Sequence, residues 1–337
     1  MRKKVQLYCG DVTEVVKDLG KARFDGVFSD LPYGIRFLGR KWDSTDVSFS
    51  RDTWDRILRV CKPGALLLAF SATRTYHRVA SAIEEGGWGV QDCLQWLRGN
   101  GFPKNRDMTD QLGAAWNGYG TSLKPGHDAV LLAQKTLNGT FTHNAQKWGC
   151  GLLNLNACRI PGDGKAKFPQ GKYANPGIFG VGCKRDGGDA HPDSRCPTNI
   201  ILDEEAACLL EQQQTGASRF FYCSRATTTE RNAGLPPGTI NDHPCVKPLR
   251  LCRYLATLIL PPARETPRRL LVPFCGTGSE IVGAILAGWD EVVGIEIEER
   301  YARIAELRIR HWASQTKPSC HEDGTRRDEP RCKCGIK

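Results

Sequence analysis

The chain has 337 residues, of which 40% are hydrophobic and 25% are charged, values that are ordinary for a globular protein. No apolar run approaches the roughly 20 residues that a membrane-spanning helix needs. The N-terminus turns polar too soon for a secretory signal, so we expect no membrane anchor and a cytoplasmic location. The formal net charge of +10 favours a polyanionic partner.

Short runs rich in aliphatic and β-branched residues predict seven strands. In chain order they are Val5 to Cys9, Asp25 to Ser29, Ala65 to Phe70, Val90 to Leu97, Ala129 to Ala133, Arg269 to Phe274 and Glu291 to Ile297. Helical patterns fall between several of them, at Asp52 to Cys61, Tyr76 to Glu85, Leu249 to Leu260 and Ser279 to Ala287. This alternation predicts an α/β fold with a doubly wound, mostly parallel seven-stranded sheet.

One interval interrupts the alternation. Between about residues 137 and 237, Gly, Asn and Pro are frequent, which is typical of loops. We therefore predict an insert at 137–237, with the α/β core formed by 1–136 and 238–315, followed by a flexible charged tail at 316–337. Cys332 and Cys334 in that tail lack the usual zinc-ligand spacing, and we predict no metal site. Six cysteines in apolar runs are expected to behave as core hydrophobes: Cys9, Cys61, Cys93, Cys208, Cys252 and Cys275.

A glycine-rich turn follows the strand that begins at Arg269, and it consists of Phe274, Cys275, Gly276, Thr277 and Gly278. Glycines let the backbone approach a ligand closely, and the N-terminus of the next helix favours a negative group. Glu296 ends the following strand, about 18 residues later, where a carboxylate can accept hydrogen bonds from ribose hydroxyls. The pattern predicts a nucleoside-containing cofactor, and its spacing allows either a nicotinamide dinucleotide or S-adenosylmethionine.

A second loop, Asp30-Leu31-Pro32-Tyr33, follows the strand at Asp25 to Ser29. It should lie at the carboxyl edge of the sheet, where open α/β sheets bind ligands. The amino group of a nucleobase is a poor nucleophile because its lone pair is delocalised into the ring. The Asp30 carboxylate and the Leu31 carbonyl can accept the two amino hydrogens and aim the nitrogen at a methyl donor. Tyr33 offers a flat surface for a flipped-out base.

These motifs resemble those of the beta group of amino-specific DNA methyltransferases of bacteria and phages, in which the catalytic loop precedes the cofactor loop. Asp30 to Tyr33 resembles the family's Asp-Pro-Pro-Tyr motif, and Pro273 to Gly278 resembles its Pro-Phe-x-Gly-Ser/Thr-Gly loop. Gly10-Asp11 is similar to an acidic turn that contacts the cofactor adenine. His243 to Pro248 is similar to the His-Pro-x-x-Lys-Pro segment, which includes Lys247 and packs beside the methionine end of the cofactor.

The resemblance implies a circularly permuted S-adenosylmethionine-dependent methyltransferase fold. It implies that 1–136 is the catalytic half, that 238–315 is the cofactor half and that the insert recognises the target. The substrate would be a flipped base in double-stranded DNA, with adenine N6 favoured because Asp rather than Ser occupies position 30. No nuclease motif is apparent, so we expect a solitary methyltransferase, monomeric or homodimeric, in a bacterial cell or phage-infected host. Candidate phosphate contacts are Arg74, Lys104, Arg106, Lys124, Lys184 and Arg185.

Two positions depart from the family pattern. Leu31 replaces a proline, which keeps the carbonyl but loses rigidity, and Val272 replaces an aspartate whose carboxylate would meet the methionine amino group. A degenerate, non-catalytic DNA-binding member therefore stays open as an alternative, as does an N4-cytosine methyltransferase. A nicotinamide-dependent oxidoreductase would share the glycine turn but leaves Asp30 to Tyr33 and His243 to Pro248 unexplained.

Overall fold

The computed structural model describes residues 3–35, 39–99, 106–161, 194–213 and 221–315. Several predictions fall outside these ranges, namely those for the tail at 316–337 and for Lys104, Lys184 and Arg185 as phosphate contacts. No helix within the described ranges is long and apolar enough to cross a bilayer.

Nine of the described strands form one sheet with the order β1-β11-β10-β2-β3-β5-β4-β8-β9. Its strands are β1 (Lys4–Cys9), β2 (Phe24–Asp30), β3 (Cys61–Ser71), β4 (Trp88–Leu97), β5 (His127–Lys135), β8 (Ile200–Leu202), β9 (Phe221–Tyr222), β10 (Arg269–Val272) and β11 (Glu291–Glu296). β5 runs antiparallel to both of its neighbours, β3 and β4. The remaining pairs are parallel. A separate two-stranded sheet joins β6 (Ile160–Pro161) and β7 (Ser194–Arg195).

The α/β fold and the mostly parallel sheet are confirmed, and each of the seven predicted strands lies in that sheet. The number of strands differs from the prediction because part of the predicted insert, β8 and β9, extends the sheet beyond β4. These strands have three and two residues, which is too short for a periodic pattern to be recognised in the sequence.

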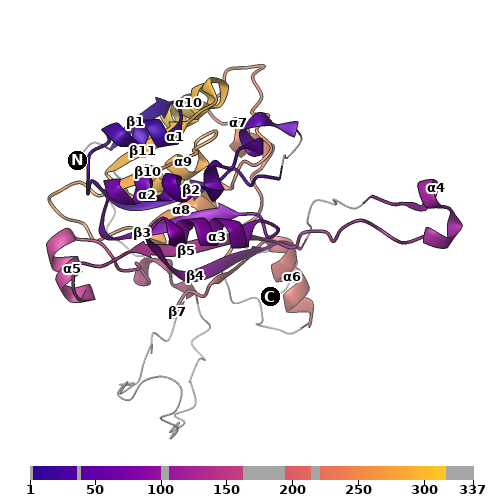
Figure 1. Ribbon diagram of the computed structural model, residues 1–337, viewed down its shortest axis with the longest axis horizontal. Coiled ribbons are helices and arrows are strands. Elements are labelled where there is room, and N and C mark those ends of the chain that lie inside the picture. The colour runs from indigo at the N-terminus through magenta and orange to yellow at the C-terminus, as the bar shows by residue number, and fades with distance from the viewer. Residues whose placement is uncertain (1–2, 36–38, 100–105, 162–193, 214–220, 316–337) are drawn as a thin grey trace, which may run out of the picture.

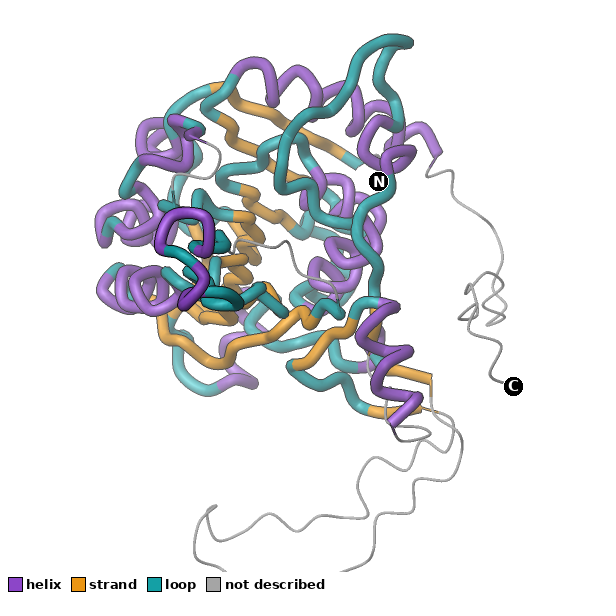
Figure 2. The backbone as a smooth tube through the Cα atoms, turned by 90° about the vertical axis from the view of Figure 1, so that its right-hand side faces the viewer, coloured by secondary structure: helices purple, strands orange, loops and turns teal. Residues whose placement is uncertain are grey.

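Helices cover both faces of the sheet, as Figures 1 and 2 show. The helices are α1 (Val12–Val15), α2 (Arg51–Val60), α3 (Tyr76–Glu85), α4 (Thr109–Leu112), α5 (Phe141–Trp148), α6 (Glu204–Gln213), α7 (Thr228–Asn232), α8 (Leu249–Leu258), α9 (Ser279–Ala287) and α10 (Glu299–Gln315). Successive residues of a strand point to opposite faces. On β3, Leu68 joins the core cluster under α8, α9 and α10, whereas Leu67 joins the cluster under α1, α2 and α3. The strands are therefore apolar on both faces, as in a doubly wound fold.

Three neighbouring parallel strands, β11, β10 and β2, bring distant segments together. β10 lies between β2 and β11, so the loops that follow these three strands meet at one carboxyl edge. The buried Ser29 hydroxyl donates a hydrogen bond to the Pro273 carbonyl, and the Cys275 amide donates to the Ile295 carbonyl at 2.9 Å. The catalytic and cofactor loops predicted from the sequence are therefore joined directly, although they are more than 240 residues apart in the chain.

The opposite, amino edge of the same strands holds a dense charge network. The Asp25 side chain is fully buried and accepts hydrogen bonds from Lys62 Nζ at 2.7 Å, Arg264 Nη2 at 2.6 Å and the Arg269 amide at 2.8 Å. Glu291, at the start of β11, pairs with Arg269 Nε at 2.7 Å and also with Arg23. Each of these buried carboxylates thus has cationic partners within hydrogen-bond distance.

The described cysteines form no disulfide with one another. Cys61, Cys252 and Cys275 are buried as predicted, but Cys93 and Cys208 are only partly buried and Cys9 is exposed, so the prediction was wrong for Cys9. Cys9 ends β1 and belongs to neither core cluster. Among the described residues, no group of three or more His, Cys, Asp or Glu side chains is arranged to hold a metal ion.

Candidate active site

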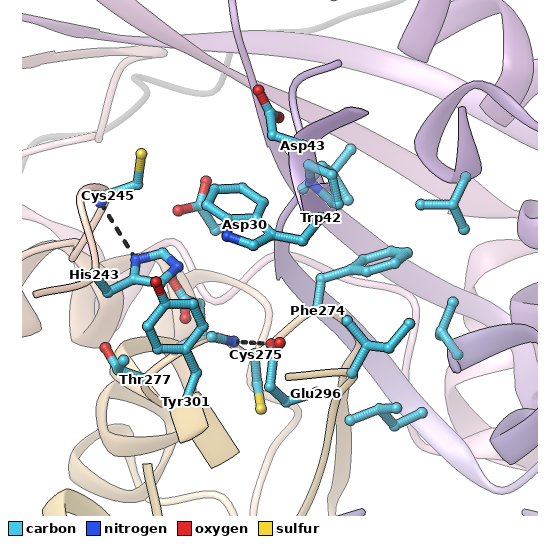
Figure 3. Close-up of a pocket in the computed structure, with 18 of the residues that line it drawn as sticks. Asp30, Trp42, Asp43, His243, Cys245, Phe274, Cys275, Thr277, Glu296 and Tyr301 are labelled. Carbon is cyan, nitrogen blue, oxygen red and sulfur yellow. Dashed lines mark hydrogen bonds between the residues drawn. The ribbon is translucent and has the colours of Figure 1, made fainter. Parts of the chain in front are cut away.

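A pocket lies at the carboxyl edge of β2, β10 and β11, and Figure 3 shows the side chains around it. The residues predicted from the sequence that line it are Asp11, Asp30, Leu31, Pro32, Tyr33, Lys247, Phe274, Cys275, Gly276, Thr277 and Glu296. Gly278 does not line it; with φ at +81° it turns the chain into α9. A Cβ at Gly278 would lie 3.1 Å from Ala305 Cβ, so this position needs glycine for both conformation and packing.

Asp30, Tyr33 and Lys247 form a connected cluster in the pocket. Lys247 Nζ lies 2.7 Å from Asp30 Oδ2, and the Tyr33 hydroxyl lies 3.1 Å from both Asp30 Oδ1 and Lys247 Nζ. Burial raises the pKa of the Asp30 carboxyl, and the charge and hydrogen bond of Lys247 oppose that rise. Burial alone would lower the pKa of Lys247, but the Asp30 carboxylate raises it well above its usual range. Lys247, predicted as a cofactor residue, therefore contacts the predicted catalytic acid.

The turn that carries Asp30 is fixed by the side chains of Asp43, Ser48 and Thr75. Asp43 is buried and accepts hydrogen bonds from the Gly34 amide at 3.0 Å and the Ile35 amide at 3.2 Å. The Ser48 hydroxyl donates to the Pro32 carbonyl at 2.6 Å, and the Thr75 hydroxyl donates to the Tyr33 carbonyl at 2.9 Å. These bonds supply rigidity to a loop that has Leu31 in place of a second proline.

The glycine-rich loop has an unusual backbone conformation. Phe274 has φ of 57°, a region that non-glycine residues rarely occupy, and such strain is often found at functional sites. Gly276 also has a positive φ, and a Cβ there would lie 3.5 Å from the His243 ring. A side chain at Gly276 would project into the pocket wall, so the glycine leaves the backbone open to a ligand.

Glu296 is held in a fixed orientation at the end of β11. Its Oε2 accepts a hydrogen bond from the Gly276 amide at 2.7 Å, and its Oε1 accepts one from the Glu298 amide at 2.9 Å. Each carboxylate oxygen keeps a further lone pair, as a hydrogen bond from a ribose hydroxyl requires. Asp11, which was predicted to contact the cofactor adenine, caps α1 by accepting a hydrogen bond from the Thr13 amide at 2.7 Å. It is exposed and lines the pocket.

Three aromatic rings close one wall of the pocket. The His243 ring stacks on Trp42 at 5.4 Å between centroids and meets the edge of Tyr301 at 4.6 Å. Burial and the nearby cations lower the pKa of His243 to about 3, so this imidazole is neutral at physiological pH. The backbone amide of Cys245 donates to its Nδ1 at 3.3 Å. Because Trp42 and Tyr301 have no motif around them, only the fold reveals their place in the site.

The residues of this pocket fit S-adenosylmethionine. The Glu296 carboxylate has acceptor capacity for ribose hydroxyls, and the apolar side chains of Val12, Phe274 and Ile297 line the same pocket, as does the Asp30 carboxylate. The fold and this pocket together define the class of S-adenosylmethionine-dependent methyltransferases.

The family follows from comparison with known sequences. A family model described as DNA methylase, covering N6 and N4 enzymes, matches residues 24–307. The chain therefore belongs to the N6/N4 DNA methylase family, whose members use S-adenosylmethionine. No curated protein matches the chain at a significant level.

Solved structures are similar in fold at low sequence identity. PvuII DNA methyltransferase, described as cytosine-N4-specific, is 11% identical with a TM-score of 0.55, and the match covers 91% of this chain and 87% of that one. The M1.HpyAVI complex with S-adenosylmethionine is 17% identical with a TM-score of 0.47, covering 90% and 98%. A putative DNA modification methylase from Thermus thermophilus is 15% identical with a TM-score of 0.44, covering 91% and 95%. The comparison with the PvuII enzyme shows the shared fold.

Proposed function

We propose that this protein transfers the methyl group of S-adenosylmethionine to the exocyclic amino group of adenine, at N6, in double-stranded DNA. The observation that carries the proposal is the Asp30–Lys247–Tyr33 cluster, which faces the same pocket as the glycine-rich loop and Glu296. Bound S-adenosylmethionine supplies an electrophilic methyl group on its sulfonium. An aspartate at position 30, rather than a serine, supports adenine over cytosine as the target.

The Asp30 turn has two acceptors for the two hydrogens of an amino group. Each Asp30 carboxylate oxygen accepts one hydrogen bond from the protein, which leaves lone pairs for a substrate hydrogen. The Pro32 and Tyr33 carbonyls are bonded to Ser48 and Thr75, but the Leu31 carbonyl receives neither of these bonds. We infer that Asp30 and the Leu31 carbonyl hold the amino group so that its lone pair points at the methyl donor.

Lys247 acts through Asp30 in this proposal. Its ammonium stabilises the carboxylate in a buried position, where an unpaired charge is costly, and fixes one carboxylate oxygen. After transfer the amino nitrogen carries one hydrogen too many. The Asp30 carboxylate accepts that proton and then passes it to solvent, which regenerates the carboxylate.

The DNA must reach this pocket from the carboxyl edge of the sheet. A base within a duplex cannot enter the pocket, so the target base has to be flipped out. Residues 106–126 project beyond the body of the protein between β4 and β5 (Figure 1). β5 starts at the carboxyl edge of β3, since Ser71 pairs with Ala129. Arg106 and Lys124 on this projection and Arg74 after β3 are exposed, and we propose that they contact DNA phosphates, with further target recognition by 137–237.

The direct test is incubation of the protein with radiolabelled S-adenosylmethionine and unmethylated genomic DNA, followed by nucleoside analysis. Label in N6-methyladenine supports the proposal. Label in N4-methylcytosine instead would assign the alternative specificity. Label in 5-methylcytosine, or only in RNA or protein, would contradict the proposed chemistry, as would transfer that is unchanged in Asp30→Ala.

A further inference from the structure

Glu280 is a buried carboxylate in the pocket wall that the proposed chemistry leaves without a role. It lies in the first turn of α9, is 3% exposed and lines the pocket. Within the described ranges no cationic side chain forms a salt bridge with it, and its side chain receives a weak hydrogen bond from the Cys252 thiol at 3.9 Å. A buried carboxylate with so little compensation is costly, which indicates that a ligand group completes its environment.

The hydrogen bonds made by the two cations near Glu280 go to other groups, and Nε and Nη2 of Arg308 have no partner among the described residues. Lys247 Nζ lies on Asp30 at 2.7 Å. Arg308 Nη1, on α10, donates a hydrogen bond to the Thr277 carbonyl of the glycine-rich loop at 2.6 Å. Both cations lower the pKa of Glu280, but burial and the nearby Asp30 carboxylate raise it to about 7. The carboxylate is therefore poised between its charged and neutral forms, and a positive ligand group would stabilise the charged one.

The pocket as a whole is acidic. The carboxylates of its described lining are Asp11, Asp30, Asp43, Glu280 and Glu296, and the ammonium of Lys247 lies among them. His243 adds no charge at neutral pH because its pKa is lowered to about 3 by burial. This excess of negative charge favours a cationic ligand.

We propose that Glu280 binds the α-ammonium group of the methionine moiety of S-adenosylmethionine. The inference rests on the cofactor of the proposed function and on the shape of the site. Glu280 lines the same pocket as Glu296 and Asp30, so a ligand with its ribose on Glu296 and its methyl group facing Asp30 would have the first turn of α9 within the wall available to its amino acid part. There Glu280 pairs with the ammonium group, while the N-terminus of α9 favours the methionine carboxylate.

This assignment changes the meaning of the departure at position 272. Val272 is fully buried at the end of β10, and it cannot provide a charge for the amino group. Glu280 lies eight residues later in the chain and provides one from the helix that follows the loop. The apolar residue at 272 then reflects a relocated contact rather than a degenerate cofactor site.

The test compares two ligands in Glu280→Gln, a substitution that keeps the size of the side chain and removes its charge. S-adenosylmethionine and 5′-methylthioadenosine, which lacks the amino acid part, are titrated by calorimetry into the full-length protein. We expect the variant to bind S-adenosylmethionine about 10–100-fold more weakly, as loss of one charge-assisted hydrogen bond implies, and to bind 5′-methylthioadenosine within about twofold of wild type. Glu299→Gln, an exposed change at the start of α10, is the matched control and should alter neither affinity.

Three results would overturn the inference. They are equal loss of affinity for both ligands, unchanged affinity for S-adenosylmethionine, or no binding of S-adenosylmethionine by the wild type. The proposed function fails separately: if the wild type binds the cofactor in a manner that depends on Glu280 but does not methylate DNA, the inference about Glu280 stands and the DNA proposal falls.

Discussion

The two edges of the central sheet use buried charge in opposite ways. At the amino edge, Asp25 has three donors within 2.8 Å. At the carboxyl edge, Asp30 has one cationic partner, and Glu280 forms no salt bridge within the described residues. Asp25 and Asp30 lie on the same strand, β2, and Glu280 lies in the helix that follows β10. The amino edge is closed by the protein's own side chains, whereas the carboxyl edge keeps bonding capacity for ligands, and that difference locates function at one edge.

The largest effect is expected from a substitution that tests whether Asp30 takes part in methyl transfer or only stabilises the fold. Asp30→Ala removes the acceptor for an amino hydrogen and should lower methyl transfer by about a thousandfold, comparable to loss of a key polar group in other active sites. S-adenosylmethionine affinity, measured by calorimetry, should stay within about twofold of wild type. If transfer and cofactor binding were lost together, Asp30 would belong with the structural charges of the amino edge.

The converse change is made at the amino edge. Asp25→Asn leaves Lys62 and Arg264 without their shared carboxylate, and breaking such a buried pair costs about 3–5 kcal/mol. Chemical denaturation should show that loss of unfolding free energy, while the folded fraction keeps its turnover rate at low temperature. Asp52→Asn is the control, since Asp52 forms an exposed pair with Arg56 worth less than about 1 kcal/mol. If Asp25→Asn folded but lost its turnover, the claim that the amino-edge charges serve stability alone would be wrong.

Lys247 should show an effect on pH dependence that a purely structural residue lacks. In Lys247→Met the burial that raises the pKa of Asp30 is opposed only by the Tyr33 hydrogen bond, so the ionised acceptor is available only at higher pH. We expect turnover at neutral pH to fall about a hundredfold and to recover partly as the pH rises. A uniform loss at all pH values would show that Lys247 supports the fold of the pocket and does not tune Asp30.

Cofactor affinity should depend on pH through Glu280. The charged groups facing it are Asp30, Lys247 and Arg308, and burial together with Asp30 raises its pKa to about 7. Below that pH the carboxyl is protonated and cannot attract an ammonium group. Affinity for S-adenosylmethionine should therefore rise up to about tenfold between pH 6 and 7.5, and the rise should be absent in Glu280→Gln. The same rise in the variant would assign the titration to another group.

The smallest effect concerns the projecting segment at 106–126. Arg106→Ala with Lys124→Ala should weaken DNA binding and flatten its salt dependence by about one phosphate per residue. The change is measured as the slope of log affinity against log salt concentration. Arg303→Ala with Arg310→Ala removes the same charge from α10, which packs on β1 at the far end of the sheet, and should leave the slope unchanged. Equal slopes in the two double variants would show that residues 106–126 do not contact DNA phosphates.

Much of this site was predictable because its residues directly follow strands. Asp30 and Glu296 each end a strand recognisable from its apolar run, and the topology then brings them to one edge. The glycine-rich loop was predictable for the same reason, because glycines that directly follow a buried strand can be recognised in the local sequence.

The rest depended on contacts that no local pattern encodes. Asp43 fixes the Asp30 turn through two backbone amides eight and nine residues away, and nothing in its neighbours distinguishes it from other loop acids. Lys247 was recognised by its motif, but its partner Asp30 lies 217 residues earlier. Glu280 reads as an ordinary acid in a first helical turn until packing of α9 on α8 shows that it is buried.

The Ser29–Pro273 hydrogen bond also has a consequence for the timing of assembly. The strand that ends at Asp30 is synthesised before its neighbour β10 and before β11, which follow it by about 240 residues or more. Contacts so distant in sequence form slowly. A ribosome-bound chain that ends before β11 has Asp30 but lacks Glu296, so we expect methyl-transfer competence to arise only after β10 and β11 have joined the sheet.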